Sequence, residues 1–183
     1  MASEPEALPG ARIIKSNRVR TVAHVPGSGG REALYVKRFR AVKSNAPLAW
    51  RFKGTPARRE WDALRRFRSA GLDCPEPVIL GEARDSWGLP QAAVLATKEI
   101  AGCEEISVAV DRLRAAGDLG GSERLTHDLA RIAWTIFQAG GNHPDMHLGN
   151  FLVRPDGGVV TLDLHSVRLS DRPVPAWLRR RRL

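Results

Sequence analysis

The sequence predicts an α+β fold in two parts, an antiparallel sheet with one helix followed by a mainly helical part. Three observations predict it. Apolar and polar residues alternate in short segments of the first half, a helix with clear start and stop residues interrupts them, and the second half opens with a long amphipathic helix before a small hairpin. Because strands and helices do not alternate regularly, we expect no doubly wound sheet.

Residues 16–25 predict a strand, and residues 26–30 (PGSGG) predict a turn. Residues 33–39 alternate apolar and polar positions and predict a second strand, which places Lys37 among aromatic neighbours on one face. Together these segments predict an antiparallel meander. Residues 40–54 are basic, and we expect them to be irregular.

A helix follows, with Thr55 as its cap, Pro56 in its first position and Gly71 at its end. Its spacing places three residues on one face: Glu60, Leu64 and Phe67.

Two further strands are expected at residues 78–80 and 92–97, separated by a turn around residues 86–88. Residues 100–105 then predict a connector between the two parts.

In the second half, Ser122 is the expected cap of a helix that ends at Gly140 and Gly141. Its apolar stripe consists of Leu125, Leu129, Ile132, Ala133, Ile136 and Phe137. After a turn-rich segment, residues 151–153 and 159–162 predict a β-hairpin.

The chain of 183 residues is 43% apolar, enough for one domain or two small lobes with a buried core. Its net charge of +9, from 29 Lys and Arg against 20 Asp and Glu, favours nucleotides, nucleic acid or an acidic membrane surface as partners. The basic residues are scattered without interleaved aromatics, so we expect no nucleic-acid binding.

The two cysteines, Cys74 and Cys103, have no metal-ligand spacing, which indicates a reducing compartment without disulfides. Residues 1–10 are acidic and lack the apolar core of a signal peptide. No apolar run has the length of a membrane span. We therefore expect a cytoplasmic protein.

Three oxygen-bearing side chains are candidates for a catalytic site. Asp145 and Asn150 lie in the turn-rich segment, and the hairpin returns Asp163 beside them. Phosphoryl transfer needs Mg²⁺ on hard oxygen ligands and a carboxylate that orients the attacking hydroxyl. Each residue alone is more often a turn former or a cap, but their order and spacing together favour the catalytic interpretation.

Lys37 and Glu60 extend this interpretation. A strand lysine can contact nucleotide phosphates, and a glutamate on the next helix can hold it. An exposed lysine and a solvated glutamate are the alternative, and the two interpretations are equally weighted from these residues alone.

Residues 143–150 (HPDMHLGN) resemble the catalytic loop of protein-kinase-like enzymes, especially of their small-molecule and lipopolysaccharide branch. Residues 18–82 resemble the N-lobe of the lipopolysaccharide core heptose kinase family. The shared segments are RT at 20–21, YVKR at 35–38, REW at 59–61, residues 71–77 followed by GE at 81–82, and the hinge-like TKEIAG at 97–102.

The resemblance implies a protein-kinase-like two-lobe fold, with an antiparallel-sheet N-lobe and a short helical C-lobe; whether this C-lobe is truncated or minimal stays open. The implied division is a flexible N-terminus (1–10), an N-lobe with hinge (11–102), a minimal C-lobe with the catalytic loop (103–172) and a basic tail (173–183).

It also implies ATP and Mg²⁺ as cofactors. Asp145 would accept or orient the proton of the acceptor hydroxyl. Asn150 and Asp163 would bind Mg²⁺. Lys37, oriented by Glu60, would contact the ATP phosphates.

The resemblance further implies that backbone groups of Glu99, Ile100 and Ala101 line the adenine pocket. His143 would be structural, and His147 would help to shape the loop.

The implied reaction moves the γ-phosphoryl group of ATP to a sugar hydroxyl of a lipopolysaccharide core or a related anionic glycolipid. Two alternatives stay open: a catalytically weak or inactive pseudokinase-like module that binds nucleotide, and a small-molecule kinase for an amino sugar.

Several departures from the kinase pattern motivate the alternatives. Pro144 replaces the usual arginine, Asp163 is followed by Leu164 and His165 instead of Phe and Gly, and no Gly-x-Gly-x-x-Gly loop is present. The chain ends 20 residues after Asp163, so either this branch is minimal, or the chain is truncated, or a partner supplies the missing surface.

The C-terminal segment WLRRRRL allows two interpretations. It is a solvated basic tail, or it contacts anionic lipid at the inner membrane through Arg179, Arg180, Arg181 and Arg182.

Overall fold

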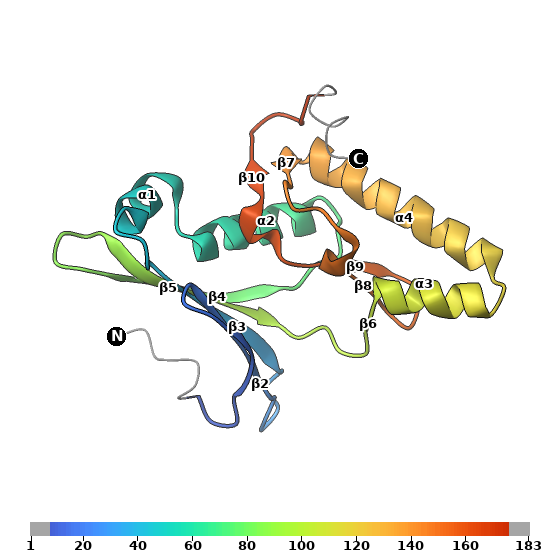
Figure 1. The fold of residues 1–183 in the computed structure, drawn as a ribbon, viewed down its shortest axis with the longest axis horizontal. Helices are drawn as coiled ribbons and strands as arrows, with labels where there is room; N and C mark the ends of the chain where they lie inside the picture. The colour runs from blue at the N-terminus through green and yellow to red at the C-terminus, as the bar shows by residue number, and fades with distance from the viewer. Residues whose placement is uncertain (1–7, 176–183) are drawn as a thin grey trace. The chain divides into compact units, whose positions relative to one another are not determined.

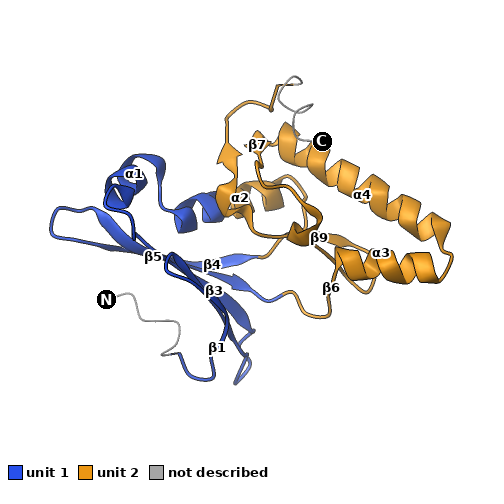
Figure 2. Cartoon of the chain, in the orientation of Figure 1, with its two compact units in different colours: residues 1–62, 76–99 blue, residues 63–75, 100–183 orange. Residues whose placement is uncertain are grey.

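The computed structural model describes residues 8–175 of the chain. The chain divides into two compact units, Met1–Asp62 with Glu76–Glu99 and Ala63–Pro75 with Ile100–Leu183 (Figure 2). Each unit is described by itself. The expected basic tail, residues 173–183, lies for the most part outside the described residues.

The first unit is built on a five-stranded antiparallel sheet with the strand order β1-β2-β3-β5-β4 (Figure 1). Its strands are β1 (Arg12–Ser16), β2 (Arg20–Val25), β3 (Leu34–Arg40), β4 (Pro77–Arg84) and β5 (Pro90–Lys98). The expected meander is confirmed, and β4 and β5 are longer than predicted. The strand expected at residues 16–25 corresponds to β2 but begins later, at Arg20, because a turn at Asn17 separates it from β1, which was not predicted.

The sheet has a buried centre and an exposed edge. In β3, Val36 and Phe39 are buried, and Leu95 of the adjacent β5 is fully buried. All five residues of β1 are exposed, so this edge strand lacks the alternation of apolar and polar residues that reveals a half-buried strand.

Helix α2 (Pro56–Ser69) begins and ends where the sequence predicts. The Thr55 hydroxyl accepts a hydrogen bond from the Arg58 amide at 3.2 Å, and Gly71 follows the helix with a φ of +81°. The predicted face is buried as a whole, at Glu60, Leu64 and Phe67.

Residues 40–54 are not irregular throughout, because Ala46–Lys53 forms helix α1. No residue of this helix is buried. A helix without a buried stripe shows no apolar periodicity, which explains the wrong prediction.

The second unit combines two helices with short strands. The helices are α3 (Ile106–Ala115) and α4 (Leu119–Gln138). The strands are β6 (Glu104–Glu105), β7 (Gly141–Asn142), β8 (Phe151–Val153), β9 (Val159–Thr161) and β10 (Arg168–Leu169), with 3₁₀ turns at Leu148–Asn150 and Leu164–Ser166. Strands β8 and β9 pair as the predicted hairpin, and β6 extends this sheet. Helix α3 was not predicted.

The expected cap of α4 is wrong by one turn. The carboxylate of Asp118 accepts a hydrogen bond from the Gly121 amide at 2.8 Å, whereas Ser122 lies inside the helix and donates to the Asp118 carbonyl. The predicted stripe is buried except at Leu129, which is half-buried. Gly140, with a φ of +78°, ends the helix as predicted.

Candidate active site

The first unit positions a lysine and a glutamate as a close ion pair. Lys37 lies in the interior of β3 and Glu60 on the buried face of α2, with Nζ 2.5 Å from Oε1. The exposed fractions of the two side chains are 16% and 2%. The sequence left a buried pair and two solvated side chains equally weighted, and the structure brings the two residues together.

At the end of β5, Glu99 is held by its backbone and by its side chain. Its amide donates to the Ala33 carbonyl at 2.9 Å, and its carboxylate lies 3.2 Å from Nε2 of His24. Because this amide is already bonded, Glu99 would have to contact a ligand through other groups. Ile100 and Ala101, the other two expected adenine-lining residues, belong to the second unit. The carbonyl oxygen of Ala101 lies 3.9 Å from the thiol sulfur of Cys103.

The loop of residues 143–150 is fixed by the end of α4. A Cβ atom on Gly140 would lie 2.1 Å from the Ser170 carbonyl oxygen, and one on Gly141 would lie 2.5 Å from the Phe67 ring. The chain therefore leaves the helix through positions where only glycine fits. Within the loop, Met146 packs against the cluster of Ala133, Phe137 and Val174.

His143 is a buried residue of this loop, with 1% of its surface exposed. Burial lowers the pKa of the imidazole, and the carboxylates of Asp145 and Asp163 act in the opposite sense. Neither ring nitrogen has a hydrogen-bond partner among the described residues. A neutral, buried ring agrees with the structural role that the resemblance implies.

Asn150 ties the loop to the hairpin. Its amide nitrogen Nδ2 donates to the Asp145 carbonyl at 2.8 Å, and its own carbonyl accepts from the Leu162 amide at 2.7 Å. Leu162 directly precedes Asp163. Two hydrogen bonds thus hold the backbone at Asp145 and at Leu162 against the same buried asparagine.

Asp163 has an unusual backbone conformation. Within residues 8–175 it is the only non-glycine residue with a positive φ, at +53° with ψ +53°. Such a conformation costs about 1–3 kcal/mol and clusters at functional sites. It turns the chain into the 3₁₀ turn Leu164–Ser166, where His165 Nδ1 lies 2.9 Å from Asp163 Oδ1.

His165 is the site residue that sequence reasoning missed. The pattern showed only that it replaces a glycine, and the contact with Asp163 depends on a left-handed conformation that the sequence does not reveal.

Asp145 presents its side chain to solvent, with 63% of it exposed. His147 Nε2 lies 3.9 Å from its Oδ1, too far for a hydrogen bond. The carboxylate is therefore accessible from solvent.

A profile of the Lipopolysaccharide kinase (Kdo/WaaP) family matches residues 11–179. The chain belongs to this family. The resemblance to the heptose kinases that the sequence suggested is thereby confirmed.

Two known proteins are similar to the chain. The lipopolysaccharide core heptose(I) kinase WaaP of Pseudomonas aeruginosa is 30% identical over 129 residues, 66% of this chain and 48% of that protein. The chain thus spans about half the length of the curated relative it matches. A solved structure of WaaP in complex with acyl carrier protein matches 95% of this chain and 68% of its own with a TM-score of 0.70, at 24% identity. This likeness confirms the predicted α+β fold with its antiparallel N-terminal sheet.

The residues expected to hold Mg²⁺ have suitable chemistry. Asn150 uses its amide nitrogen internally, which leaves its side-chain oxygen as the donor atom. Asp163 contributes a carboxylate. Mg²⁺ prefers such hard oxygen ligands, so the donor set fits this ion.

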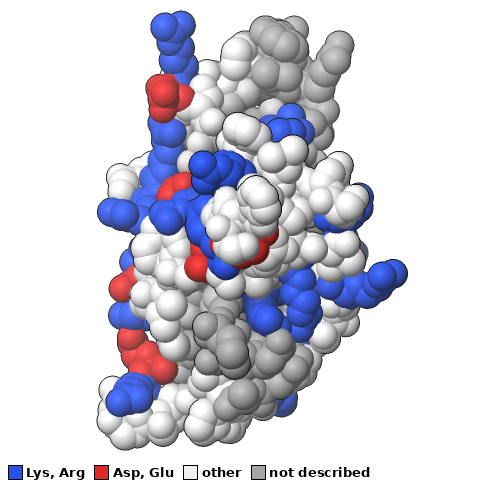
Figure 3. Space-filling model, turned by 90° about the vertical axis from the view of Figure 1, so that its left-hand side faces the viewer, with Lys and Arg blue, Asp and Glu red and all other residues white. Residues whose placement is uncertain are grey.

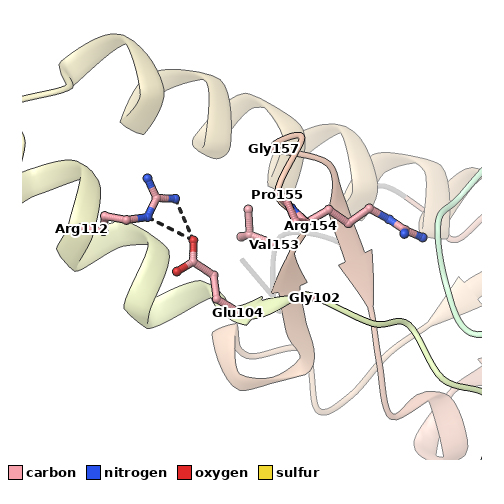
Figure 4. Close-up of a pocket in the computed structure, with 7 residues that line it drawn as sticks. All are labelled: Gly102, Glu104, Arg112, Val153, Arg154, Pro155 and Gly157. Atoms are coloured by element: carbon pink, nitrogen blue, oxygen red, sulfur yellow. Dashed lines mark hydrogen bonds and ion pairs between the residues drawn. The ribbon is translucent and has the colours of Figure 1, made fainter. Parts of the chain in front are cut away.

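A cavity of about 350 Å³ in the second unit is lined by other residues, among them Arg112, Val153 and Arg154 (Figure 4). It borders the turn between β8 and β9, whereas Asn150 and Asp163 flank the opposite end of the hairpin. Its two arginines already bind carboxylates, Arg112 that of Glu104 at 2.7 Å and Arg154 that of Asp73 at 2.6 Å. This cavity is therefore not the candidate active site.

Among the described residues, the helices are too short or too polar to cross a bilayer.

Proposed function

We propose that the chain is an ATP-dependent phosphotransferase that moves the γ-phosphoryl group to a sugar hydroxyl of a lipopolysaccharide core or a related anionic glycolipid. The acceptor oxygen forms the new bond to phosphorus, the bond to the ADP oxygen breaks, and the hydroxyl proton passes to Asp145. The 30% identity with the Pseudomonas aeruginosa kinase supports this acceptor class.

The observation that carries the proposal is the hydrogen-bonded link through Asn150. The side chain of Asn150 holds the Asp145 carbonyl, and its backbone carbonyl holds the amide of Leu162, the residue before Asp163. An accessible base and two oxygen ligands are thereby held by one short segment, as phosphoryl transfer requires.

In this mechanism each residue has a separate task. Asp145 orients the attacking hydroxyl and takes its proton. Asn150 and Asp163 would hold Mg²⁺, which neutralises charge on the phosphate oxygens when bound. Lys37 contacts the phosphates, and Glu60 keeps its ammonium group in place.

We further propose that the segment Glu99, Ile100 and Ala101 contacts the adenine through backbone groups. The bonded amide of Glu99 restricts its part to other groups. In this proposal residues 11–102 form the nucleotide-binding lobe with its hinge, and residues 103–172 carry the catalytic loop.

The test is Mg²⁺-dependent transfer from ATP to purified lipopolysaccharide core. We expect transfer to disappear in Asp145→Ala and in Asp163→Ala. Asp111→Ala is the matched control, because Asp111 is an exposed carboxylate on α3, and it should retain full activity. Unchanged transfer in both site variants would exclude the proposed mechanism.

A pseudokinase-like nucleotide-binding module is the second candidate. The observation that favours it is that the sequence has no Gly-x-Gly-x-x-Gly loop before the Lys37 strand. A thermal shift with Mg²⁺ and ATP separates the two candidates. Stabilisation without transfer to any acceptor, amino sugars included, would assign the chain to this second class.

A further inference from the structure

The first unit carries a basic and apolar surface that the proposed reaction does not use. We call it the α1 surface, and it consists of Lys43, Leu48, Arg51, Phe52, Lys53 and Arg58. Leu48 and Phe52 are 55% and 80% exposed. They are four residues apart on α1 and therefore share one face of the helix.

The charge of the α1 surface has a single sign. Residues 40–59 contain six Lys and Arg and no Asp or Glu. Lys43, Arg51, Lys53 and Arg58 are exposed, and none of these four makes an ion pair with a residue in the part of the chain that the structure describes. Four cationic groups thus remain available to an anionic partner.

A second exposed aromatic residue belongs to the same unit. Helix α1 contacts β5, and the turn that joins β4 to β5 carries Trp87, which is 86% exposed. The view in Figure 3 shows Lys and Arg side chains beside uncharged surface on the side of the molecule that faces the viewer, with some Asp and Glu side chains among them.

In water, helix α1 leaves its apolar side chains unburied. A helix of eight residues gains little stability from its own hydrogen bonds, and α1 buries none of its residues. Exposed Phe and Leu side chains on a helix rich in Lys and Arg are typical of elements that lie in the plane of a membrane interface.

We propose that the α1 surface docks on an anionic lipid bilayer. Leu48 and Phe52 enter the headgroup region, and the four basic side chains contact lipid phosphates. A bilayer fits better than a folded protein, because four exposed cationic groups of one sign surround an exposed apolar pair on one short helix. It fits better than nucleic acid, because Leu48, one of the two exposed apolar side chains of α1, is aliphatic and cannot stack on a base. Docking is independent of phosphoryl transfer, so it would hold even for an inactive chain.

The test is co-sedimentation of the full chain with two kinds of vesicle, phosphatidylcholine alone and phosphatidylcholine mixed with phosphatidylglycerol. We expect binding to the mixed vesicles and little to the neutral ones. Replacing a basic residue near an anionic surface lowers the partition coefficient about fivefold, so Lys43→Gln/Lys53→Gln should lower it about 25-fold. Leu48→Ser/Phe52→Ser should lower it on the order of tenfold.

Matched controls separate the α1 surface from general charge and hydrophobicity. Lys15→Gln removes an exposed lysine of β1, and Leu119→Ser removes a leucine of α4 that is 77% exposed. Both should bind like the wild type. Circular dichroism spectra and thermal unfolding show whether each variant is folded, and transfer to a soluble sugar acceptor should be unchanged in all of them.

Three results would overturn the proposal. One is the absence of binding to both vesicles. The second result is that both α1 double variants bind like the wild type, whereas a variant with the arginines at 179–182 replaced does not bind. This would assign the contact to the C-terminal segment. The third is release of the chain from the vesicles by duplex DNA at lower concentration than by free phosphatidylglycerol, which would assign the surface to nucleic acid.

Discussion

Removing one member of the Lys37–Glu60 pair should destabilise the protein, whereas removing both should not. Glu60→Leu replaces the buried carboxylate by an apolar side chain and leaves the ammonium group of Lys37 without the partner 2.5 Å away. Lys37→Met does the reverse. The double variant Lys37→Met/Glu60→Leu replaces the pair by two apolar side chains of similar volume.

The magnitudes follow from the distance and the burial. Two unit charges 2.5 Å apart attract by about 7 kcal/mol at an effective dielectric constant of about 20. Desolvation of each ion opposes this by several kcal/mol, so the net contribution of the pair is small. Replacing Glu60 alone should cost about 3–5 kcal/mol of unfolding free energy, because Lys37 keeps its charge and loses its contact with this buried carboxylate. The double variant should lie within about 1–2 kcal/mol of the wild type.

Urea unfolding of the four proteins gives the coupling energy, and ATP-dependent transfer gives the activity. We expect transfer to be lost in both single variants and in the double variant, although the double variant is stable. If the losses of unfolding free energy in the two single variants add up to the loss in the double variant, Lys37 and Glu60 are not coupled, and the buried pair is refuted. Full transfer in the stable double variant would refute the role of Lys37 at the phosphates.

Three further predictions concern the second unit. His165→Ala should weaken Mn²⁺ binding in the presence of nucleotide about tenfold, measured by electron paramagnetic resonance, and His165→Asn should restore part of it; equal affinities would refute the orienting contact with Asp163. Burial lowers the pKa of His143 below its ordinary value of 6.5, so the unfolding free energy should fall as pH drops from this value through the lower folded-state pKa, and His143→Gln should flatten this dependence; parallel pH profiles would contradict it. Arg154→Met should cost only about 1 kcal/mol in urea unfolding, because its ion pair with Asp73 is partly exposed; a loss several times larger would show that water screens the pair less than its exposure indicates.

The elements that bury a patterned face were predictable. Helix α2 has a capping threonine, a proline in its first turn and a closing glycine, and all three act as the sequence predicts. The hairpin β8–β9 and the stripe of α4 follow from the same local rules.

The elements without such a face were not predictable. Strand β1 and helix α1 bury no residue, so no period marks them. The cap of α4 was misplaced because both Asp118 and Ser122 are capping residue types, and the choice between them depends on where α3 ends.

The candidate site was likewise predictable only in part. Lys37, Glu60, Asp145, Asn150 and Asp163 were selected by residue type, order and spacing. The link through Asn150 follows from the predicted hairpin, whereas the left-handed conformation of Asp163 and its contact with His165 arise from tertiary packing and have no local signal.

The most direct measurement of the central claim compares binding and transfer in Asp145→Asn and Asp163→Asn. Each variant is assayed for stabilisation by ATP with and without Mg²⁺, and for transfer of the labelled γ-phosphoryl group to lipopolysaccharide core. The account predicts that Asp145→Asn keeps the Mg²⁺-dependent stabilisation and loses transfer, and that Asp163→Asn loses both. Transfer at the wild-type rate in Asp145→Asn, or undiminished Mg²⁺-dependent stabilisation in Asp163→Asn, would contradict it.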